Sequence, residues 1–486
     1  MNAQTDDTGA AAARYLHPAT LAQLPREVAR PQYDRGAIDI GVVHFGPGAF
    51  HRAHQAWFFE SLLSRDRRWG ICAVSLRSHD VRDALVPQAN LYTLAIRDEV
   101  MSYQVIGAIK ELLLAPESPE AVLQRLSSAR THVVTLSVTE KGYCLAADGS
   151  LDLGHPDVRQ DLEHPRSPRS VIGFLVEALR RRREARVPPF TVVSCDNLVD
   201  NGVKLARATA QLASMSDRGL GAWIEREVSF PRTMVDSITP ATTDALKDSV
   251  AKTLGLRDRW PVQREAFTQW VIEDVFRHTV PDWQSVGITL TNDVAGYDRA
   301  KLRLLNGAHS TLAYVGLLRG YVTVCDAMKD PELRGFVRTL MTQDIVPSLK
   351  APRGLELASY IESILRRFGN PAMHHELAQI AWDGSQKLPF RLLGTIRDAL
   401  DAQRPVERLC VPIAAWMRFV RRAALRGEPV KDPLAPRLME IGRACEGRGA
   451  ADVTRFMSLE SVFPLPLRSD PRFTEALAVA YDNLPT

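Results

Sequence analysis

The stretch 37–63, AIDIGVVHFGPGAFHRAHQAWFFESLL, decides the fold of this protein. It begins with a short apolar run and continues through a turn that contains two glycines. It ends in a segment where Ala56, Phe59 and Leu63 recur every three to four residues. This order predicts a β-strand, a glycine turn and an amphipathic helix. The stretch therefore predicts the first strand-helix unit of an α/β domain.

Three further apolar runs follow, each separated from the last by a segment with helical or polar character. They are WGICAVSL (69–76), THVVTLSVT (131–139) and FTVVSCDNL (190–198). Strands that alternate with helices are typical of a mainly parallel sheet with helices on both faces. The pattern predicts a Rossmann-type, doubly wound N-terminal domain.

The second half of the chain has a different pattern, because long helical repeats replace the strands after about residue 290. The clearest repeats lie at 301–320, 354–368 and 408–426. The sequence therefore predicts a tail and connecting segment over 1–36, a Rossmann-type dinucleotide-binding domain over 37–290 and a mainly α-helical substrate domain over 291–486.

The composition excludes some classes of function. The chain has 486 residues, with 61 lysines and arginines against 57 aspartates and glutamates. This nearly balanced charge gives no sign of a nucleic-acid or membrane surface. The basic run LRRRREARV at 179–187 follows an apolar helical pattern, and cations suit the C-terminal end of a helix. We interpret the run as a solvated helix end.

The cysteines and the N-terminus indicate a compartment. The six cysteines are scattered without the spacing of a zinc or redox motif, which is usual in a reducing cytoplasm. The first residues carry acids where a signal peptide has a basic and then an apolar segment. No run approaches the roughly 18 apolar residues of a membrane helix. We expect a cytoplasmic protein.

The glycine turn is the first candidate site. Gly46 and Gly48 would let backbone amides approach a pyrophosphate at the start of a helix. The third position of the usual dinucleotide fingerprint is His51 rather than glycine, and any strand-to-helix turn favours glycine. From these residues alone, a cofactor site and a plain structural turn are both open.

The end of the second strand bears on the choice of cofactor. In LRSHD (76–80), Asp80 stands where an acid usually accepts the ribose hydroxyls of NAD. Arg77 and Arg82 are close in sequence and would instead attract the 2′-phosphate of NADP. The pattern favours NAD and leaves NADP possible.

An apolar helical pattern at 301–320 contains three polar residues, Lys301, Asn306 and His309. Burying such groups costs several kcal/mol in rough terms unless partners satisfy them. In an α-helix Asn306 and His309 share a face, and Lys301 lies about 80° around from His309. This juxtaposition needs a reason beyond packing.

Six separated stretches together resemble the mannitol dehydrogenase family of polyol-specific long-chain dehydrogenases, which also contains fructuronate reductases. They are FGPGAFHRAHQA (45–56), TEKGYC (139–144), VVSCDNLVDNG (192–202), MVDSITP (234–240), AKLRLLNGAHS (300–310) and DGSQKLP (383–389). The resemblance implies a zinc-independent, NAD-dependent oxidoreductase. Such an enzyme interconverts a secondary alcohol and a ketone on a small-molecule polyol or aldonate, as in mannitol and fructose or mannonate and fructuronate.

The resemblance also implies roles for the polar residues. Hydride transfer from an alcohol needs a base for the hydroxyl proton and donors for the developing alkoxide. By resemblance, Lys301 is the general acid/base, Asn306 and Asn197 hold the alkoxide oxygen, and His309 hydrogen-bonds the substrate. An ammonium is a poor base near neutral pH, so the site would have to lower the pKa of the lysine. No metal is needed.

The same resemblance assigns binding residues. Asp236 and Lys387 are the implied substrate-binding residues. The implied cofactor-binding residues are Gly46, Gly48, Phe50, Arg77, Asp80 and Thr139.

Most of these residues also have an ordinary structural interpretation. His309 alone would be a satisfied core histidine, and Asn197 alone would be a helix cap or a turn residue. Asp236 alone would cap a turn, and Lys387 alone would be a solvated loop lysine. Their occurrence together in the order of the family favours the functional interpretation.

Two positions depart from the family pattern. Asp298 stands where members often carry Glu upstream of the lysine, and Gln379 stands where polyol-oxidising members tend to have Arg. The sequence around DGSQKLP is more similar to that of fructuronate reductases. A carboxylate substrate would need another cation in the site, and Lys387 and Arg391 are the candidates. Mannitol and mannonate are both open as substrates.

Functions of other classes are weighed against this hypothesis. A Rossmann-like methyltransferase shares the glycine turn but gives no reason for a lysine, an asparagine and a histidine on one helix. A non-catalytic NAD-binding regulator would bind the cofactor without turnover. A metal hydrolase would use His44, His51 and His54, but their spacing lacks a carboxylate partner in register.

Overall fold

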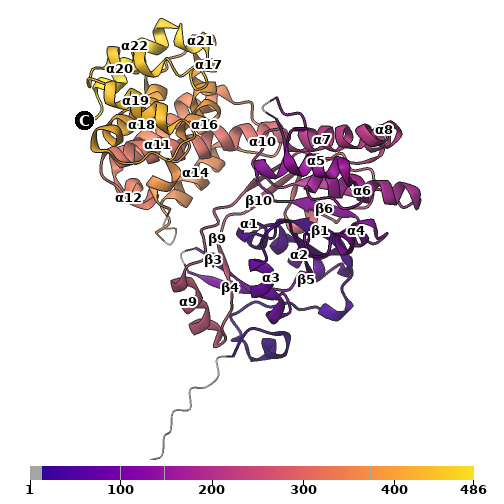
Figure 1. Cartoon of the computed structure of the whole chain (residues 1–486). Coiled ribbons are helices and arrows are strands. Elements are labelled where there is room, and N and C mark those ends of the chain that lie inside the picture. The colour runs from indigo at the N-terminus through magenta and orange to yellow at the C-terminus, as the bar shows by residue number, and fades with distance from the viewer. Residues whose placement is uncertain (1–13, 99, 147, 372–374, 486) are drawn as a thin grey trace, which may run out of the picture. The chain divides into compact units, whose positions relative to one another are not determined.

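The computed structural model describes residues 14–485 except 99, 147 and 372–374. The contacts divide the chain into two compact units, Met1–Val294 and Ala295–Thr486. The part of the expected N-terminal tail that covers residues 1–13 lies outside the described residues. The two units are described separately (Figure 1).

The N-terminal unit is built on a five-stranded sheet in which neighbouring strands are parallel. Its strands are β1 (Ile40–Phe45), β2 (Gly70–Ser75), β5 (Ile109–Leu114), β6 (Val133–Leu136) and β7 (Thr191–Ser194). Their order is β5-β2-β1-β6-β7. Four of these strands lie within the four apolar runs of the sequence, and the parallel order confirms the predicted Rossmann-type sheet.

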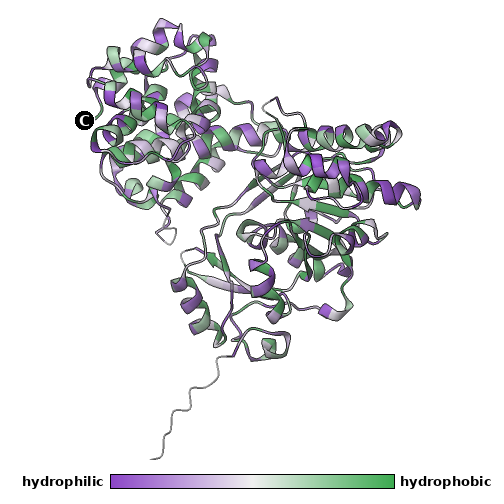
Figure 2. Cartoon of the chain, in the orientation of Figure 1, coloured by the Kyte–Doolittle hydropathy of each residue, from purple (hydrophilic) through white to green (hydrophobic). Residues whose placement is uncertain are grey.

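Helices cover both faces of this sheet. Successive side chains of a strand point to opposite faces, so a strand of apolar residues needs a cover on each side. Val43 and Phe45 of β1 pack in one apolar cluster with residues of α4, α6, α7 and α8. Val42 packs in a second cluster with residues of α1 and α2. The helices of this unit are α1 (Ala49–Ala53), α2 (Gln55–Leu63), α3 (Asp80–Leu85), α4 (Pro119–Ser127), α5 (Pro156–Glu163), α6 (Val171–Glu184), α7 (Asn201–Ser216), α8 (Arg218–Glu227) and α9 (Asp244–Leu254). Figure 2 shows hydrophobic colour along the strands between these helices.

The basic end of α6 is less solvated than the sequence indicates. Arg182 is buried and donates hydrogen bonds of 2.8 Å to the carbonyls of Leu126 and Ser128 at the end of α4. Its neighbours Arg180 and Arg181 form ion pairs with Glu177. The arginine thus satisfies carbonyl groups that a helix end leaves without partners.

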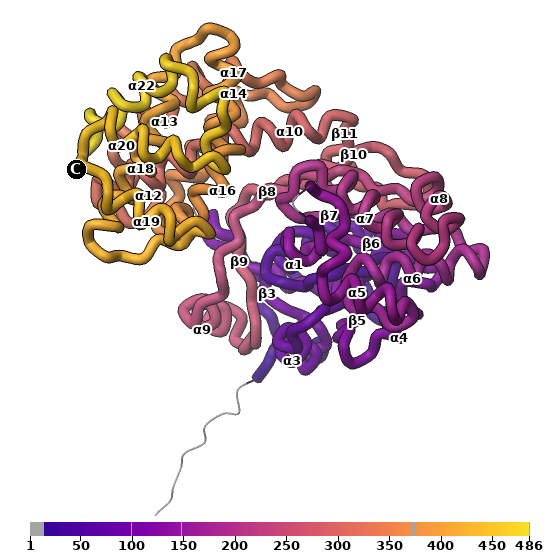
Figure 3. The backbone as a smooth tube through the Cα atoms, turned by 45° about the horizontal axis from the view of Figure 1, so that its top comes forward, coloured from indigo at the N-terminus to yellow at the C-terminus, as the bar shows by residue number. Residues whose placement is uncertain are grey.

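Two small sheets complete the N-terminal unit. One has the order β4-β3-β9 and the other β11-β10-β8. Their strands are β3 (Tyr92–Arg97), β4 (Ser102–Ile106), β8 (Thr233–Asp236), β9 (Val262–Glu265), β10 (Gln269–Glu273) and β11 (Thr289–Thr291). Figure 3 traces the chain through β8, α9 and β9 beside the large sheet of the same unit.

Part of the segment expected to be a tail and connection is packed against this unit. Leu16, Leu24 and Val28 are buried in an apolar cluster with residues of α9. The amide of Ala29 donates to the carbonyl of Tyr103 in β4 at 3.0 Å. These three apolar residues form no regular period, and backbone hydrogen bonds such as the one from Leu16 to the carbonyl of Arg257 at 2.8 Å hold the segment together with them.

The C-terminal unit is helical. Its helices are α10 (Val294–Ala300), α11 (Gly307–Leu318), α12 (Val324–Lys329), α13 (Pro331–Thr339), α14 (Leu357–Phe368), α15 (Leu377–Ile380), α16 (Gly384–Leu388), α17 (Gly394–Asp401), α18 (Glu407–Arg426), α19 (Ala435–Ala444), α20 (Gly449–Phe456), α21 (Leu465–Arg468) and α22 (Pro471–Asp482). The long helix α18 packs against α11, α19 and α22. Among the residues that the structure describes, no helix has the length and apolar character needed to cross a membrane.

Candidate active site

The carboxyl edge of the large sheet collects the predicted cofactor residues of the N-terminal unit. The strand order reverses between β1 and β6, and ligands of such sheets bind at this switch point. Gly46 follows β1, and Thr139 follows β6. Asp80 and Asn197 follow the outer neighbours, β2 and β7. Separate motifs of the sequence therefore meet at one edge.

The two glycines of the turn have different requirements. Gly46 has a φ of +91°, and a Cβ there would lie 2.2 Å from the carbonyl oxygen of Ser137. The fold itself therefore needs glycine at this position. A Cβ on Gly48 would approach nothing closer in the protein than the Gly46 oxygen at 4.0 Å. The packing of the chain does not explain why residue 48 is a glycine. A ligand that approaches the backbone closely would explain it.

Phe50 and the three histidines of this motif lie in or beside α1. The rings of His44 and His51 stack with centroids 3.4 Å apart, and Phe50 stacks on His54 at 4.9 Å. His44 contacts Thr135 Oγ1 at 2.7 Å through Nδ1, and burial lowers its pKa to about 3. Both ring nitrogens of His51 are buried without a hydrogen-bond partner in the described structure.

These histidines do not form a metal site. His54 contacts the carbonyl of Gln269 through Nε2 at 2.9 Å, so its ring is used within the unit. Within the described ranges no cluster of three or more histidine, cysteine or acidic side chains is arranged to hold a metal ion. The hypothesis of a metal hydrolase has no support here.

The charged residues after β2 are unequally available to a ligand. Asp80 begins α3 with about two thirds of its side chain exposed, and it accepts a hydrogen bond of 2.7 Å from Ser78. Arg82 is held by Glu117 and Asp83. Arg77 is exposed and forms an ion pair of 3.1 Å with Asp157. The carboxylate of Asp80 thus makes no ion pair with either arginine in the described structure.

Asp196 is a residue of this edge that the sequence did not reveal. It follows β7 directly and accepts hydrogen bonds of 3.0 Å from the amides of Val138 and Thr139 and of 2.7 Å from the hydroxyl of Tyr143. The neighbouring Asn197 is exposed. The sequence gives only a weak signal for Asp196, because an Asp-Asn pair after a strand is common in ordinary turns.

Asp236 lies in the same unit. It is the last residue of β8 and is buried. The hydroxyl of Thr233 on the same strand donates to the carbonyl of Ser194 at the end of β7. This bond links β8 to the strand that precedes Asn197.

In the C-terminal unit, the expected α-helix over 301–320 begins differently. Lys301–Asn306 form a π-helical turn, in which the amide of Gly307 bonds to the carbonyl of Leu302 five residues earlier, and α11 follows. The i→i+5 hydrogen bonds of such a turn bring residues five apart closer together around the helix axis than an α-helix does. Lys301 and Asn306 therefore share a face, whereas an α-helix would place them about 140° apart.

The third polar residue extends this face. His309 lies three residues after Asn306 within α11, and residues at this spacing are neighbours on an α-helix. Lys301 and His309 are both buried, with 6% and 7% of their surface exposed. The π turn thus aligns the three predicted catalytic residues of this unit.

His309 is surrounded by aromatic and cationic side chains. Its ring lies 4.4 Å from Phe368 and 5.2 Å from His375, centroid to centroid. Its Nε2 is buried without a hydrogen-bond partner in the described structure. Burial, followed by the charges of His375 and Arg391, holds the pKa of His309 well below its ordinary value. A buried neutral imidazole with an open nitrogen suits hydrogen bonding to a ligand.

Lys387 and Arg391 lie on the segment that packs beside this turn. Arg391 donates a hydrogen bond of 3.0 Å to Ser310. Lys387 reaches the carbonyl of Ile380 only at 3.5 Å, and burial lowers its pKa. His375, which the sequence did not suggest, has a buried Nδ1 without a partner in the part of the chain that is described.

The two departures from the family pattern lie near this group in the sequence. Asp298 is half-buried on α10, one turn before Lys301, and Gln379 is exposed on α15. The exposed amide of Gln379 does not add a charge to the cationic group around His309.

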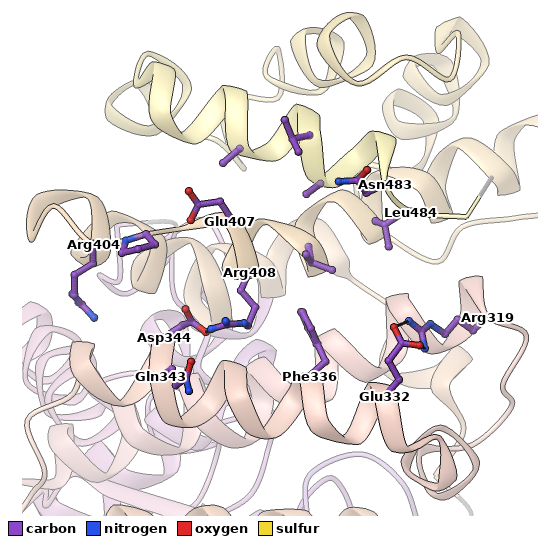
Figure 4. A pocket seen from close by; sticks show the side chains of 15 residues that line it. Arg319, Glu332, Phe336, Gln343, Asp344, Arg404, Glu407, Arg408, Asn483 and Leu484 are labelled. Atoms are coloured by element: carbon purple, nitrogen blue, oxygen red, sulfur yellow. Dashed lines mark hydrogen bonds and ion pairs between the residues drawn. The ribbon is translucent and has the colours of Figure 1, made fainter.

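A cavity elsewhere in the helical unit contains none of the predicted site residues. It has a volume of about 700 Å³ and is lined by α13, α18, α22 and the π-helical turn Leu340–Ile345. Figure 4 shows the ion pair of Asp344 and Arg408 at one end and that of Arg319 and Glu332 at the other. Because none of the predicted site residues lines this cavity, we assign it no role in catalysis.

A Rossmann-type unit followed by a helical unit is an architecture found among dinucleotide-dependent oxidoreductases, and the comparisons show which family of them this chain resembles. Residues 40–285 match the model of the mannitol dehydrogenase Rossmann domain, and residues 293–485 match that of the mannitol dehydrogenase C-terminal domain. The chain belongs to the mannitol dehydrogenase family.

Individual relatives are similar over almost the whole chain. The D-mannonate oxidoreductase of Escherichia coli (strain K12) is 42% identical over 466 residues, which are 94% of this chain and 96% of the relative. The mannitol 2-dehydrogenase of Pseudomonas fluorescens, solved as a ternary complex with NAD and D-mannitol, is 36% identical, with a TM-score of 0.83 and 96% of each chain covered. A D-sorbitol dehydrogenase in substrate-free form is 33% identical, with a TM-score of 0.84 over 95% of this chain and 100% of that one. These relatives give no support to a methyltransferase or a non-catalytic regulator.

Proposed function

We propose that this protein is an NAD-dependent oxidoreductase that interconverts a secondary alcohol and a ketone on an acyclic sugar polyol or aldonate. The observation that carries the proposal is the π-helical turn that brings the half-buried Asn306 onto the same face as the buried Lys301 and His309. No packing requirement explains three polar side chains aligned in an apolar helix, whereas alcohol oxidation needs a base and hydrogen-bond donors at one point.

Each residue of this face has a role in the proposal. Lys301 accepts the hydroxyl proton during oxidation and returns it during reduction. The amide of Asn306 donates to the oxygen on which negative charge develops, and we propose the same role for Asn197. The open nitrogen of His309 hydrogen-bonds a substrate hydroxyl. Asp236 and Lys387 are proposed to bind the rest of the substrate.

The residues of the large sheet fit the cofactor. NAD supplies the hydride acceptor when it is bound. The open space over Gly48 admits a pyrophosphate against the backbone, and Phe50 lies on the helix that begins there. Arg77 follows β2 and Thr139 follows β6, the two strands that flank β1 in the sheet. The proposal is supported by the NAD in the ternary complex of the Pseudomonas fluorescens relative.

The experiment that tests the proposal is a substrate screen of the purified protein. Mannitol, sorbitol, arabinitol, mannonate and their ketone counterparts are offered with NAD(H) and with NADP(H), and turnover is followed by the absorbance of the reduced cofactor. We expect turnover with at least one polyol or aldonate pair. Cofactor binding without turnover of any of them would favour a regulator instead.

The choice of cofactor gives a specific prediction. Asp80 has an exposed carboxylate that repels a 2′-phosphate, while Arg82 is already held by two acids. We therefore expect the wild type to prefer NAD, and Asp80→Ala to shift the ratio of kcat/KM values toward NADP by about tenfold or more. Steady-state kinetics with both cofactors measure this ratio.

A second variant separates charge from shape. Asp80→Asn keeps the size of the side chain and removes its charge, so it should move the ratio in the same direction as Asp80→Ala. If Asp80→Asn leaves the preference unchanged, or if the wild type already prefers NADP, repulsion by Asp80 does not determine the choice.

The cations around His309 favour an aldonate, which carries a carboxylate, as a substrate of this enzyme. Lys387 is held by one long contact, and a charged hydrogen bond to a carboxylate contributes about 1.5 to 3 kcal/mol. Lys387→Met should therefore raise the KM for mannonate by about 10- to 150-fold. For uncharged mannitol we expect a change below about threefold. The exposed Lys350→Met is the matched control, and equal effects on both substrates would argue against a carboxylate site.

A further inference from the structure

The turn after β6 contains a backbone conformation that proteins rarely give to a threonine. Thr139 has φ +65° and ψ 165°, a region that is essentially restricted to glycine. A β-branched residue there is a genuine outlier. Such strain persists only where the surroundings determine the conformation, and it occurs most often at functional sites.

The surroundings that determine it are the carboxylate of Asp196 and its partners. Oδ1 accepts from the amide of Thr139, and Oδ2 accepts from the amide of Val138 and the hydroxyl of Tyr143. The same hydroxyl lies 2.6 Å from Ser194 Oγ at the end of β7. One carboxylate therefore fixes both ends of the turn Val138–Tyr143.

Asp196 also connects two residues that the proposed function uses. Its backbone continues directly into Asn197, and its carbonyl accepts hydrogen bonds from the Leu198 amide at 2.9 Å and from Asn201 Nδ2 at 3.2 Å. The backbone carbonyl of Thr139 accepts from the amide of Gly142 at 3.0 Å, and the residue as a whole is exposed. The strained turn therefore places an exposed threonine just after β6, beside the switch point between β1 and β6.

We propose that Asp196 is a positioning residue of the active site. Its carboxylate holds Thr139 in a glycine-like conformation, and this fixes both residue 139 at the carboxyl edge of the sheet and the start of the segment that carries Asn197. The inference rests on the proposed NAD-dependent function. The acid does not contact the substrate or take part in proton transfer.

Asp196→Asn tests this directly, because it replaces one acceptor oxygen with a donor that faces an amide. We expect a lower Tm, a weaker affinity for NADH measured by its fluorescence and a fall in kcat/KM of about tenfold or more. Tyr143→Phe is the matched control. It removes one bond to the same carboxylate and keeps both amide bonds, so its effect on NADH affinity should be clearly smaller.

The decisive measurement is a double-mutant cycle with Thr139→Gly. Glycine adopts the conformation of residue 139 without strain, so the losses caused by Asp196→Asn in Tm and in NADH affinity should be at least halved in the Thr139→Gly background. If Asp196→Asn alone yields no folded protein, Thr139→Gly should restore soluble protein.

Additive effects on both readouts, or no restoration of soluble protein, would overturn the proposal. Equal losses of NADH affinity in Tyr143→Phe and Asp196→Asn would also overturn it. Because Tm and NADH affinity do not require turnover, these outcomes are separate from a failure to find any polyol or aldonate substrate.

Discussion

Lys301→Ala is expected to lower turnover by about two to four orders of magnitude while NADH affinity stays nearly unchanged. General acid/base catalysis contributes about this factor, which corresponds to roughly 3 to 5 kcal/mol of transition-state stabilisation. Lys301 is buried at the start of the π-helical turn, one turn before Asn306, so removing it removes the proton acceptor of the aligned face. Steady-state kinetics and NADH titration measure both quantities.

Arg299→Ala is the matched control, because Arg299 is an exposed cation two residues earlier on α10. It should retain nearly full activity. The pH dependence gives an independent check. Oxidation needs neutral lysine and should rise with pH, whereas reduction needs the charged form and should fall with pH. Activity of Lys301→Ala above a tenth of the wild type would contradict the assignment.

Gly48→Val is expected to weaken NADH binding by about two orders of magnitude and to change the Tm little. The φ of Gly48 is −67°, which valine adopts without strain, and apart from the adjoining chain the nearest atom to a Cβ at this position is the Gly46 oxygen at 4.0 Å. The added side chain would fill the space that the pyrophosphate needs. NADH fluorescence titration and thermal unfolding measure the two effects.

Gly46→Ala is the contrasting variant, two residues away. Its φ of +91° and the Ser137 oxygen 2.2 Å from the new Cβ predict a loss of stability, of which the backbone strain alone contributes about 1 to 3 kcal/mol. If Gly48→Val lowers the Tm as much as Gly46→Ala does, Gly48 serves the fold. If Gly48→Val binds NADH normally, the cofactor does not approach this turn.

Four strands of the large sheet were predictable because they are buried on both faces and read as continuous apolar runs, whereas β5 (IKELLL), which is only partly buried, was not predicted. The six strands of the two small sheets were not predicted. β9 contains Gln263, Arg264 and Glu265, and all three are buried. The sequence of β9 is therefore polar although the strand lies in the interior. A pattern of hydrophobic residues does not reveal a strand whose polar side chains find partners within the fold.

The site shows a similar division. The lysine, asparagine and histidine of the helical unit were predicted from their place in an apolar segment, and the glycine turn from its motif, and both stay predictions. The π turn was not predicted, since the leucines of 302–318 fit an α-helical spacing. Asp196 was missed because its importance lies in the conformation of Thr139, 57 residues away in the sequence. Such a relation exists only after folding.

The stacked pair of His44 and His51 under the glycine turn affects how the whole protein responds to acid. An imidazole in the unfolded chain takes up a proton near pH 6.5, whereas burial lowers the pKa of His44 to about 3 and that of His51 well below its ordinary value. Below pH 6.5 the unfolded chain therefore binds more protons than the folded one. The contribution of these two neutral histidines to the free energy of unfolding should be fully present above this pH. Below it, the free energy of unfolding should fall by up to about 1.4 kcal/mol per pH unit for each histidine. Urea unfolding at a series of pH values measures this slope, and His44→Gln should reduce it.

The ring pair that supports the proposed cofactor turn thus also limits how acidic a medium the fold tolerates.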